Sequence, residues 1–290
     1  MKKQTKEFLK ILMLTQEELY NYIINFLTIR DIKYKAKDEA YIYINDHACN
    51  VTRPLLTSHL DTINDSYNKL PRLSIKDNII TTTNKSVLGG DDRAGVWVML
   101  QLLDKGIMDY DYVFFCDEEV GGLGSKLFAK EQLIDIIEYS CYISLDRRGS
   151  KEVASYGYDN DDLVKIFTDI GYTSVRGTFT DCVNLSNVTE VACINLSVGY
   201  NNEHTNSEVQ DITVMYNLVN RLSNASIIDK LSTREYRYED IQVYNNQWSS
   251  YKEVLNEPML CDCCGEHLPL YDCDVSSNSY YLCSDCLKYY

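Results

Sequence analysis

The sequence predicts an α/β protein with a mixed, mostly parallel β-sheet and helices on both faces, followed by a small separate module. Apolar runs of strand length alternate with stretches of helical periodicity over roughly the first 225 residues. Six of the eleven cysteines then fall between Cys261 and Cys286. We therefore expect a main domain over residues 1–228, a connector over residues 229–258 and a cysteine-rich module over residues 259–290.

The first part of the main domain is expected to hold a helix, two strands and a hairpin. Residues 7–26 carry apolar side chains at helical spacing. Residues 40–44 form a short alternating stretch, and residues 54–57 form an apolar run. A hairpin is predicted over residues 72–82, with its turn at Asp77-Asn78.

The rest of the main domain continues the alternation. A helix is expected over residues 94–103, closed by Gly106. The compact apolar runs 112–116 and 141–145 indicate buried strands. A further helix, a strand and a closing helix are expected over residues 163–170, 191–196 and 207–222. Ser207 is the expected N-cap of the closing helix.

Composition and charge exclude several classes of protein. Hydrophobic residues make up 45% of the chain and charged residues 24%, as in ordinary globular proteins. The formal net charge of −15 argues against a broad nucleic-acid-binding surface. No apolar run reaches the length of a membrane span, and Lys6, Glu7 and Lys10 interrupt what would be the core of a signal peptide. We expect a cytoplasmic protein without membrane contact, which also suits the five scattered cysteines.

Five acidic or histidine-bearing segments lie where apolar strands are expected to end. They are His59-Leu60-Asp61, Asp91-Asp92, Glu118-Glu119, Asp146 and His204. Carboxylates gathered at strand ends repel one another unless cations lie between them or their pKa values rise. Histidine with aspartate or glutamate is the ligand set of catalytic zinc, and five such ligands are enough to hold two ions. The sequence therefore predicts a two-metal centre.

The local pattern suggests how these residues would act. In an extended segment the side chains of His59 and Asp61 point to the same side, so His59 could bind a metal while Asp61 orients its ring. Asp91 follows two glycines at a helix start, where the helix dipole favours an anion, and its two oxygens could bridge two cations. Glu118 and Glu119 diverge, so one could bind metal while the other acts as a general base.

Four ordered motifs strengthen this interpretation. They are Ser58-His59-Leu60-Asp61-Thr62, Leu88-Gly89-Gly90-Asp91-Asp92-Arg93-Ala94-Gly95, Asp117-Glu118-Glu119-Val120-Gly121 and Asn202-Glu203-His204-Thr205. Together they resemble the motifs of the zinc exopeptidases with two co-catalytic ions, among them peptidase T and related aminopeptidases. The resemblance spans roughly residues 14–222. A further stretch, Gly177-Thr178-Phe179-Thr180-Asp181, is similar to a Thr-Asp stretch that lies near the site in that family, and it receives no catalytic role.

The resemblance implies a role for each residue. One zinc would be bound by His59 and Asp146, the other by Glu119 and His204, with Asp91 bridging the two. Glu118 would be the general base, and Asp61 would support His59. The chain departs from the lidded members of the family, because only 57 residues (147–203) lie between Asp146 and His204 and only 29 (62–90) between Asp61 and Asp91. It resembles the minimal catalytic domain of the single-domain aminopeptidases.

The cysteine-rich module fits a structural zinc ribbon. Cys261-x2-Cys264 and Cys283-x2-Cys286, with eighteen residues between them, suit a four-thiolate site. Cys263, His267 and Cys273 leave other ligand choices open, and disulfides are the competing interpretation. Because Lys288 is the only lysine or arginine from Cys261 onward, a structural role or a protein partner that docks on the ribbon is preferred over nucleic-acid binding.

The leading hypothesis is a zinc-dependent hydrolase with two catalytic ions and one structural ion, an aminopeptidase that acts on short peptides. The alternatives are an amidase or deacylase that acts on a non-peptide substrate with the same centre, and an inactive scaffold that recruits a partner through the ribbon. Arg93, Arg147 and Arg148 lie near the expected site in sequence, and they are candidates for pairing with a substrate carboxylate.

Overall fold

A computed structural model describes most of the chain. The described residues are 3–37, 39–45, 52–63, 70–136, 138–158 and 160–238, together with the short paired strands β13 (Asp274–Val275) and β14 (Tyr281–Leu282). The chain divides into two compact units, Met1–Glu239 and Asp240–Tyr290. The four cysteines expected to bind a structural zinc lie outside the described residues, so that prediction stays a prediction.

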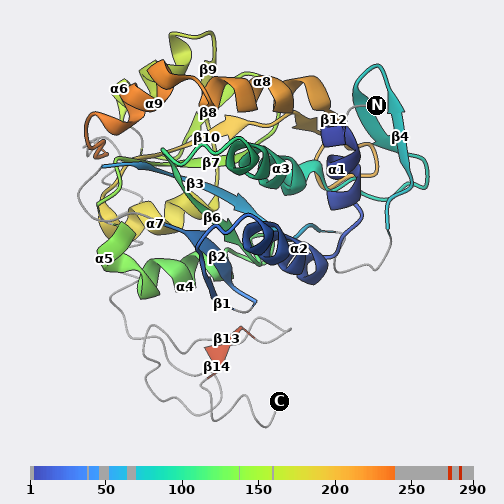
Figure 1. The fold of residues 1–290 in the computed structure, drawn as a ribbon, viewed down its shortest axis with the longest axis horizontal. Helices are drawn as coiled ribbons and strands as arrows, with labels where there is room; N and C mark the ends of the chain where they lie inside the picture. Colours follow the sequence, from blue (N-terminus) through green and yellow to red (C-terminus); the bar gives the residue numbers. More distant parts are fainter. Residues whose placement is uncertain are drawn as a thin grey trace. The chain divides into compact units, whose positions relative to one another are not determined.

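The first unit is built on an eight-stranded sheet (Figure 1). Its strands, in spatial order, are β1 (Lys35–Lys37), β2 (Tyr41–Ile44), β6 (Asp111–Phe115), β3 (Pro54–His59), β7 (Cys141–Arg147), β10 (Cys193–Ser197), β8 (Glu152–Ser155) and β9 (Thr173–Arg176). The four central strands β6, β3, β7 and β10 are parallel, and β8 is parallel to β9. The pairs β1–β2, β2–β6 and β10–β8 are antiparallel. The predicted mixed, mostly parallel α/β sheet is therefore confirmed.

Helices cover both faces of this sheet, because its strands present apolar side chains on each side. In β2, Ile42 and Ile44 face one apolar cluster while Tyr41 and Tyr43 face the other. The first cluster receives α1 (Lys3–Ile11), α2 (Gln16–Ile29), α3 (Gly90–Asp104), α6 (Asp161–Thr168), α8 (Ile212–Leu222) and α9 (Ala225–Ser232). The second receives α4 (Leu123–Glu131), α5 (Leu133–Ile136) and α7 (Asp181–Thr189). Strands β3, β6 and β10 are buried along their length, and β7 is buried except for its last two residues, which explains their apolar runs.

A smaller antiparallel sheet lies beside the start of α3. Its order is β11 (Tyr200–Asn201), β12 (Val209–Asp211), β5 (Ile79–Thr82) and β4 (Leu73–Lys76). The predicted hairpin is confirmed: β4 and β5 pair, and Asp77 and Asn78 in its turn have φ values of 53° and 67°. Both values suit the type I′ turns that match the twist of the flanking strands. Because β12 pairs with β5, this sheet joins two segments that are far apart in sequence.

Two predicted helices differ from the structure. The first is interrupted, and the closing helix begins later than expected. The stretch 7–26 is not one helix, because α2 starts afresh at a capping box. The Thr15 hydroxyl accepts from the Glu18 backbone N–H at 3.2 Å, and the Glu18 carboxylate accepts from the Thr15 N–H at 2.9 Å. The closing helix begins at Ile212 and not at Ser207. Its N-cap is Asp211, which accepts from the Thr213 N–H at 2.7 Å, and the residues just before it form β12.

Several residues assigned to the connector by sequence pack into the first unit. Helix α9 ends at Ser232, and the buried Tyr236 donates its N–H to the Ser140 carbonyl oxygen at 2.7 Å. The Tyr236 carbonyl oxygen accepts from the Ala192 N–H at 2.8 Å.

Within the described residues, no helix is long and apolar enough to cross a membrane.

Candidate metal centre

Three of the segments that carry predicted site residues end at one edge of the main sheet. His59 is the last residue of β3, Glu118 and Glu119 follow β6, and Asp146 lies near the end of β7. These three strands are adjacent and parallel, so their carboxyl ends meet at the same edge. Asp91 and His204 arrive from the side of the small sheet, Asp91 in the first turn of α3 and His204 between β11 and β12. The fold thus gathers side chains from five segments.

Asp91 lies between the two histidines. Its Oδ1 is 3.2 Å from His59 Nε2, and its Oδ2 is 3.2 Å from His204 Nε2. His204 Nε2 is also 2.8 Å from Glu119 Oε1, and His59 Nε2 is 3.7 Å from Asp146 Oδ1. The structure therefore brings together the five side chains that the sequence nominated as ligands, with one Asp91 oxygen toward each imidazole.

Two groups of side chains in this cluster could hold a metal ion. His59, Asp91 and Glu119 form one, and His59, Asp92 and Asp146 form the other. In each group, one ligand atom per residue lies within 4.8 Å of the others. Nitrogen and carboxylate donors of this kind suit catalytic zinc. The second group includes Asp92 where the sequence nominated Asp91.

The Asp92 carboxylate is engaged with the protein on both oxygens. Oδ2 accepts from the Ser58 hydroxyl and from the His59 backbone N–H at 3.2 Å, and Oδ1 accepts from the Gly95 N–H at 3.1 Å. Asp92 is completely buried. It fastens the first turn of α3 to the end of β3, whereas the Asp91 oxygens face the histidines. Asp91 is therefore the better candidate for a metal ligand.

Asp61 fixes both His59 and the turn that carries the two glutamates. Its Oδ1 is 3.2 Å from His59 Nδ1. The backbone N–H groups of Glu118 and Glu119 donate to Asp61 Oδ1 and Oδ2 at 3.0 and 2.9 Å. A carboxylate on the second nitrogen of a histidine sets its tautomer and its orientation. The Asp61 carboxylate therefore links the His59 ring to the turn that carries Glu118 and Glu119.

Three residues hold Asp146 by hydrogen bonds, and two of them, Tyr200 and Asn195, were not predicted from the sequence. Tyr200 donates its hydroxyl to Asp146 Oδ1 at 3.1 Å, and the Thr180 hydroxyl donates to Oδ2 at 3.1 Å. The Asn195 side chain accepts from the Asp146 N–H and donates to the Asp146 carbonyl oxygen, both at 2.9 Å. All three are buried. Only Thr180 had a sequence signal, in the Thr-Asp stretch, since Tyr200 and Asn195 look like ordinary strand residues.

Three carboxyl groups of the centre have raised pKa values, because their negative charge is poorly compensated. Burial, together with the neighbouring Asp91, raises the pKa of Asp146 to about 6. Burial raises the pKa of Glu118 to about 9, with further increases from Asp146 and Asp181. Burial also raises the pKa of Asp181 to about 7. These shifts express an excess of negative charge in a poorly solvated place, which a bound cation would relieve.

The neighbouring carboxylates also raise the pKa values of the two histidines. Hydrogen bonds to Asp91 and Glu119 raise the pKa of His204 to about 11. Burial alone would lower the pKa of His59, but hydrogen bonds to Asp146, Asp61 and Asp91 raise it well above its usual range. Both imidazoles thus favour positive charge at the positions where a cation would bind.

The arginines considered for substrate binding are engaged elsewhere. Arg93 is buried and donates to the Leu14 carbonyl oxygen at 2.8 Å, so it supports the α1–α2 junction, and the suggestion that it pairs with a substrate is wrong. Arg147 Nε lies 2.8 Å from a Glu152 oxygen. Arg148 forms an exposed ion pair with Glu203 at 2.9 Å.

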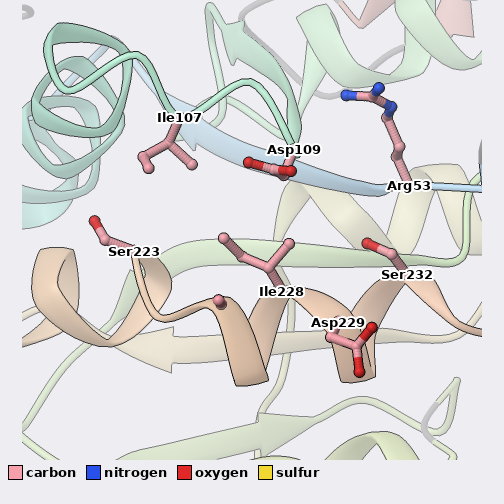
Figure 2. A pocket seen from close by; sticks show the side chains of 8 residues that line it. Arg53, Ile107, Asp109, Ser223, Ile228, Asp229 and Ser232 are labelled. Atoms are coloured by element: carbon pink, nitrogen blue, oxygen red, sulfur yellow. The ribbon is translucent and has the colours of Figure 1, made fainter.

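A separate cavity of about 700 Å³ lies at the other end of β3 (Figure 2). Its lining comprises Arg53, Ile107, Asp109, Ser223, Ala225, Ile228, Asp229 and Ser232. Arg53 immediately precedes β3, whereas His59 ends that strand. The cavity therefore contains none of the clustered histidines and carboxylates, and it is distinct from the candidate centre.

Comparison with known proteins shows the fold. No protein-family model matches the chain, and no curated protein matches it either. Among solved structures, aminopeptidase PepT from Bacillus cereus is 15% identical with a TM-score of 0.62, over 79% of this chain and 98% of that one. A tripeptidase from Staphylococcus aureus is 14% identical with a TM-score of 0.63, over 80% and 98%. A glutaminyl cyclase from Porphyromonas gingivalis is 16% identical with a TM-score of 0.51, over 72% and 87%. The chain has the fold of these enzymes, and that fold hosts more than one activity.

Proposed function

We propose that this protein is a zinc-dependent hydrolase of amide bonds, an aminopeptidase that acts on short peptides. The observation that carries the proposal is the position of Asp91, with one carboxylate oxygen 3.2 Å from His59 and the other 3.2 Å from His204. A carboxylate so placed is suited to bridge two cations. The names of similar structures, an aminopeptidase and a tripeptidase, support the choice of peptide substrates.

The donor set fits two zinc ions. In this proposal one ion is held by His59 and Asp146, the other by Glu119 and His204, and both by Asp91. Two nitrogen and three carboxylate donors are the mixture that catalytic zinc sites use. When bound, the ions would polarise the scissile carbonyl and lower the pKa of water toward neutrality. A third zinc, held by Cys261, Cys264, Cys283 and Cys286, is proposed for the ribbon over residues 259–290.

Glu118 is the proposed general base. Its backbone N–H is bound to Asp61, so the side chain starts from a fixed point beside His59. Burial, with a smaller contribution from the acidic neighbours Asp146 and Asp181, raises its pKa to about 9. Bound cations would lower this pKa toward the working pH. A base with a pKa near the working pH can take a proton from water and return it to the leaving amine.

The arginines near the centre do not favour the carboxyl end of a peptide. Arg147 is paired with Glu152, and Arg148 with Glu203. A site that selects a substrate carboxylate needs a cation to pair with it. This supports an aminopeptidase rather than a carboxypeptidase.

The test is hydrolysis of matched peptides with free, N-blocked and C-blocked ends, with metal content measured in parallel. We expect cleavage of free-amine and C-blocked peptides, no cleavage of N-blocked ones, and loss of activity with a chelator. Cleavage of N-acyl substrates alone would indicate a deacylase with the same centre. Glu118→Gln is the matched control for a contaminating peptidase, since it should be inactive with its metal retained.

A further inference from the structure

Glu208 is a buried acid whose side chain holds the turn before Asp91. Its Oε2 accepts from the backbone N–H groups of Leu88 and Gly89, both at 2.9 Å. Its Oε1 accepts from the Gly90 N–H at 2.7 Å and from the Asp91 N–H at 3.3 Å. Only 2% of Glu208 is exposed. One carboxylate therefore satisfies four consecutive backbone donors.

The turn is shaped to surround this carboxylate. Gly89 has a φ of 78°, in the left-handed region, and such turns direct successive N–H groups toward one anion. A Cβ on Gly90 would lie 2.8 Å from Gln210 Oε1 and 3.0 Å from Glu208 Oε1, so the backbone fits against Glu208 only without a side chain. An ionised carboxylate suits this place because it accepts hydrogen bonds and donates none.

Glu208 also belongs to the segment that carries His204. It follows His204 by four residues, and its own N–H donates to the Thr205 carbonyl oxygen at 3.2 Å. The next residues form β12, which pairs with β5 in the small sheet. The His204 segment and the Asp91 turn are thus fastened to each other through one side chain, close to the 3.2 Å contact between His204 Nε2 and Asp91 Oδ2.

We propose that Glu208 is a positioning residue of the centre, which holds the Leu88–Asp91 turn so that the Asp91 carboxylate stays between His59 and His204. Its contact with Asp91 is through the backbone N–H, so it acts on the carboxylate through the turn. In its consequence for metal binding the inference rests on the proposed two-metal function. Groups that orient a ligand in this way typically change metal affinity by about 10- to 100-fold when they are removed.

The test is metal retention by the full-length Glu208→Gln variant. The amide replaces one oxygen with an NH2 group, which cannot accept from the backbone donors. After zinc loading, we expect half of the chelatable zinc to leave at a chelator concentration at least about tenfold lower than for the wild type. Co²⁺ loading gives a second readout, since an altered visible spectrum would report a changed ligand geometry.

Asp211→Ala is the matched control. Asp211 lies three residues along the same segment and also accepts a backbone N–H, that of Thr213 at 2.7 Å, but it caps α8. Its loss should lower the melting temperature and leave the chelator midpoint unchanged. If Glu208→Gln yields no folded protein, Glu208→Asp carries the same comparison, because the shorter side chain keeps the charge but cannot reach all four donors.

The outcomes separate the two proposals. A lowered melting temperature with an unchanged chelator midpoint in either Glu208 variant would show a purely structural role and overturn this inference, while the two-metal function would stand. A wild-type protein that binds no ion beyond that of the ribbon would overturn the proposed function, and the inference with it. A shifted midpoint in the Glu208 variant, with none in Asp211→Ala, supports both.

Discussion

The carboxylates around the candidate centre fall into two kinds, according to the groups that they contact. Asp92 and Glu208 accept backbone N–H groups and hold loops together. Asp61 does so too, and it also faces His59 Nδ1 at 3.2 Å. Asp91 and Glu119 face histidine nitrogens at 3.2 and 2.8 Å. Groups of the first kind are satisfied within the protein, and those of the second kind are placed to share a cation with the imidazoles. The distinction cannot be made from residue type, since both kinds occur in the same acidic motifs.

Glu118→Gln should abolish turnover while the metal content stays near that of the wild type. The amide cannot take up a proton, and general-base transfer contributes about a hundredfold or more to the rate. The measurement is kcat on a short peptide together with zinc per chain. Glu119→Gln is the comparison, because loss of a proposed ligand should reduce zinc as well as activity. Substantial activity in Glu118→Gln, or loss of its metal, would reverse the roles assigned to the two glutamates.

His204 should make the stability of the metal-free protein fall as the pH rises. Its pKa rises from the usual 6.5 to about 11 in the fold, because Asp91 and Glu119 bind the protonated ring. The folded state therefore holds a proton that the unfolded state releases between these pH values. The resulting stabilisation is fully present below 6.5 and is lost progressively as the pH approaches 11.

Melting temperatures of chelator-treated protein from about pH 6 to about pH 9 test this slope. His204→Asn should make the slope shallower, since the amide does not titrate, while Glu118 and His59, whose pKa values are also raised, keep part of it. Asp146 and Asp181, whose pKa values are also raised, add to the same downward slope at lower pH. A melting temperature that rises with pH in the metal-free wild type would contradict the expectation.

At the scale of elements, the contact between α3 and β7 depends on Gly95. A Cβ at this position would lie 1.9 Å from the Leu145 carbonyl oxygen and 2.6 Å from Asp92 Oδ1. Gly95→Ala should therefore destabilise the protein by roughly 3 kcal/mol, the upper part of the range for overpacking, and it should also disturb Asp92. Thermal unfolding gives the measurement.

Gly106→Ala is the control for that substitution. Gly106 has a φ of 71°, but no atom lies within 4 Å of the added Cβ. Backbone strain alone should cost about 1 kcal/mol there. If the two alanine variants unfold at the same temperature, the close approach of α3 to β7 does not limit stability.

Elements with a clear local pattern were predictable, and those made by distant contacts were not. The hairpin β4–β5 and the buried central strands follow from turn residues and apolar runs. Strand β9 has the sequence Thr-Ser-Val-Arg and is mostly exposed, so it lacks the alternation of a half-buried strand. Strand β12 places the buried, polar Gln210 against β5, which no local signal indicates. The break before α2 was readable, since Thr15 and Glu18 form a capping-box pattern.

The same contrast holds for the candidate site. The ligand candidates stood out because histidine is rare in this chain and acidic pairs at strand ends are costly without compensation. Tyr200, Asn195 and Glu208 did not stand out, because their importance comes from contacts across the fold. Ordinary polar residues acquire such roles only when the sheet brings their partners close.

At the scale of the whole molecule, the segment between Asp146 and His204 completes the main sheet. It forms β8, α6, β9, α7 and β10 before the chain reaches β11. These residues therefore build part of the sheet that carries the centre. The side chain of His204 keeps 42% of its surface exposed, which leaves one side of the centre open to solvent.

Removing the cysteine-rich module should separate the two proposed kinds of zinc. A chain that ends at Asn256 retains the whole first unit, Met1–Glu239, with its own apolar core. We expect it to lose one zinc per chain and to keep two, because the catalytic ligands all lie in that unit. Four thiolates form a closed site whose binding energy is folding energy for the ribbon, so mild chelation of the full chain should remove the catalytic ions first.

The decisive measurements on this truncated chain are zinc stoichiometry and hydrolysis of a short peptide. Cys261→Ser with Cys283→Ser in the full chain is the control, since it removes two proposed ligands without shortening the protein. Activity should largely survive both changes. An unchanged zinc content would show that the module binds no metal. Lost activity with two zinc ions retained would instead make residues beyond Asn256 part of the working site, because the first unit would then hold its metals without being able to turn over substrate.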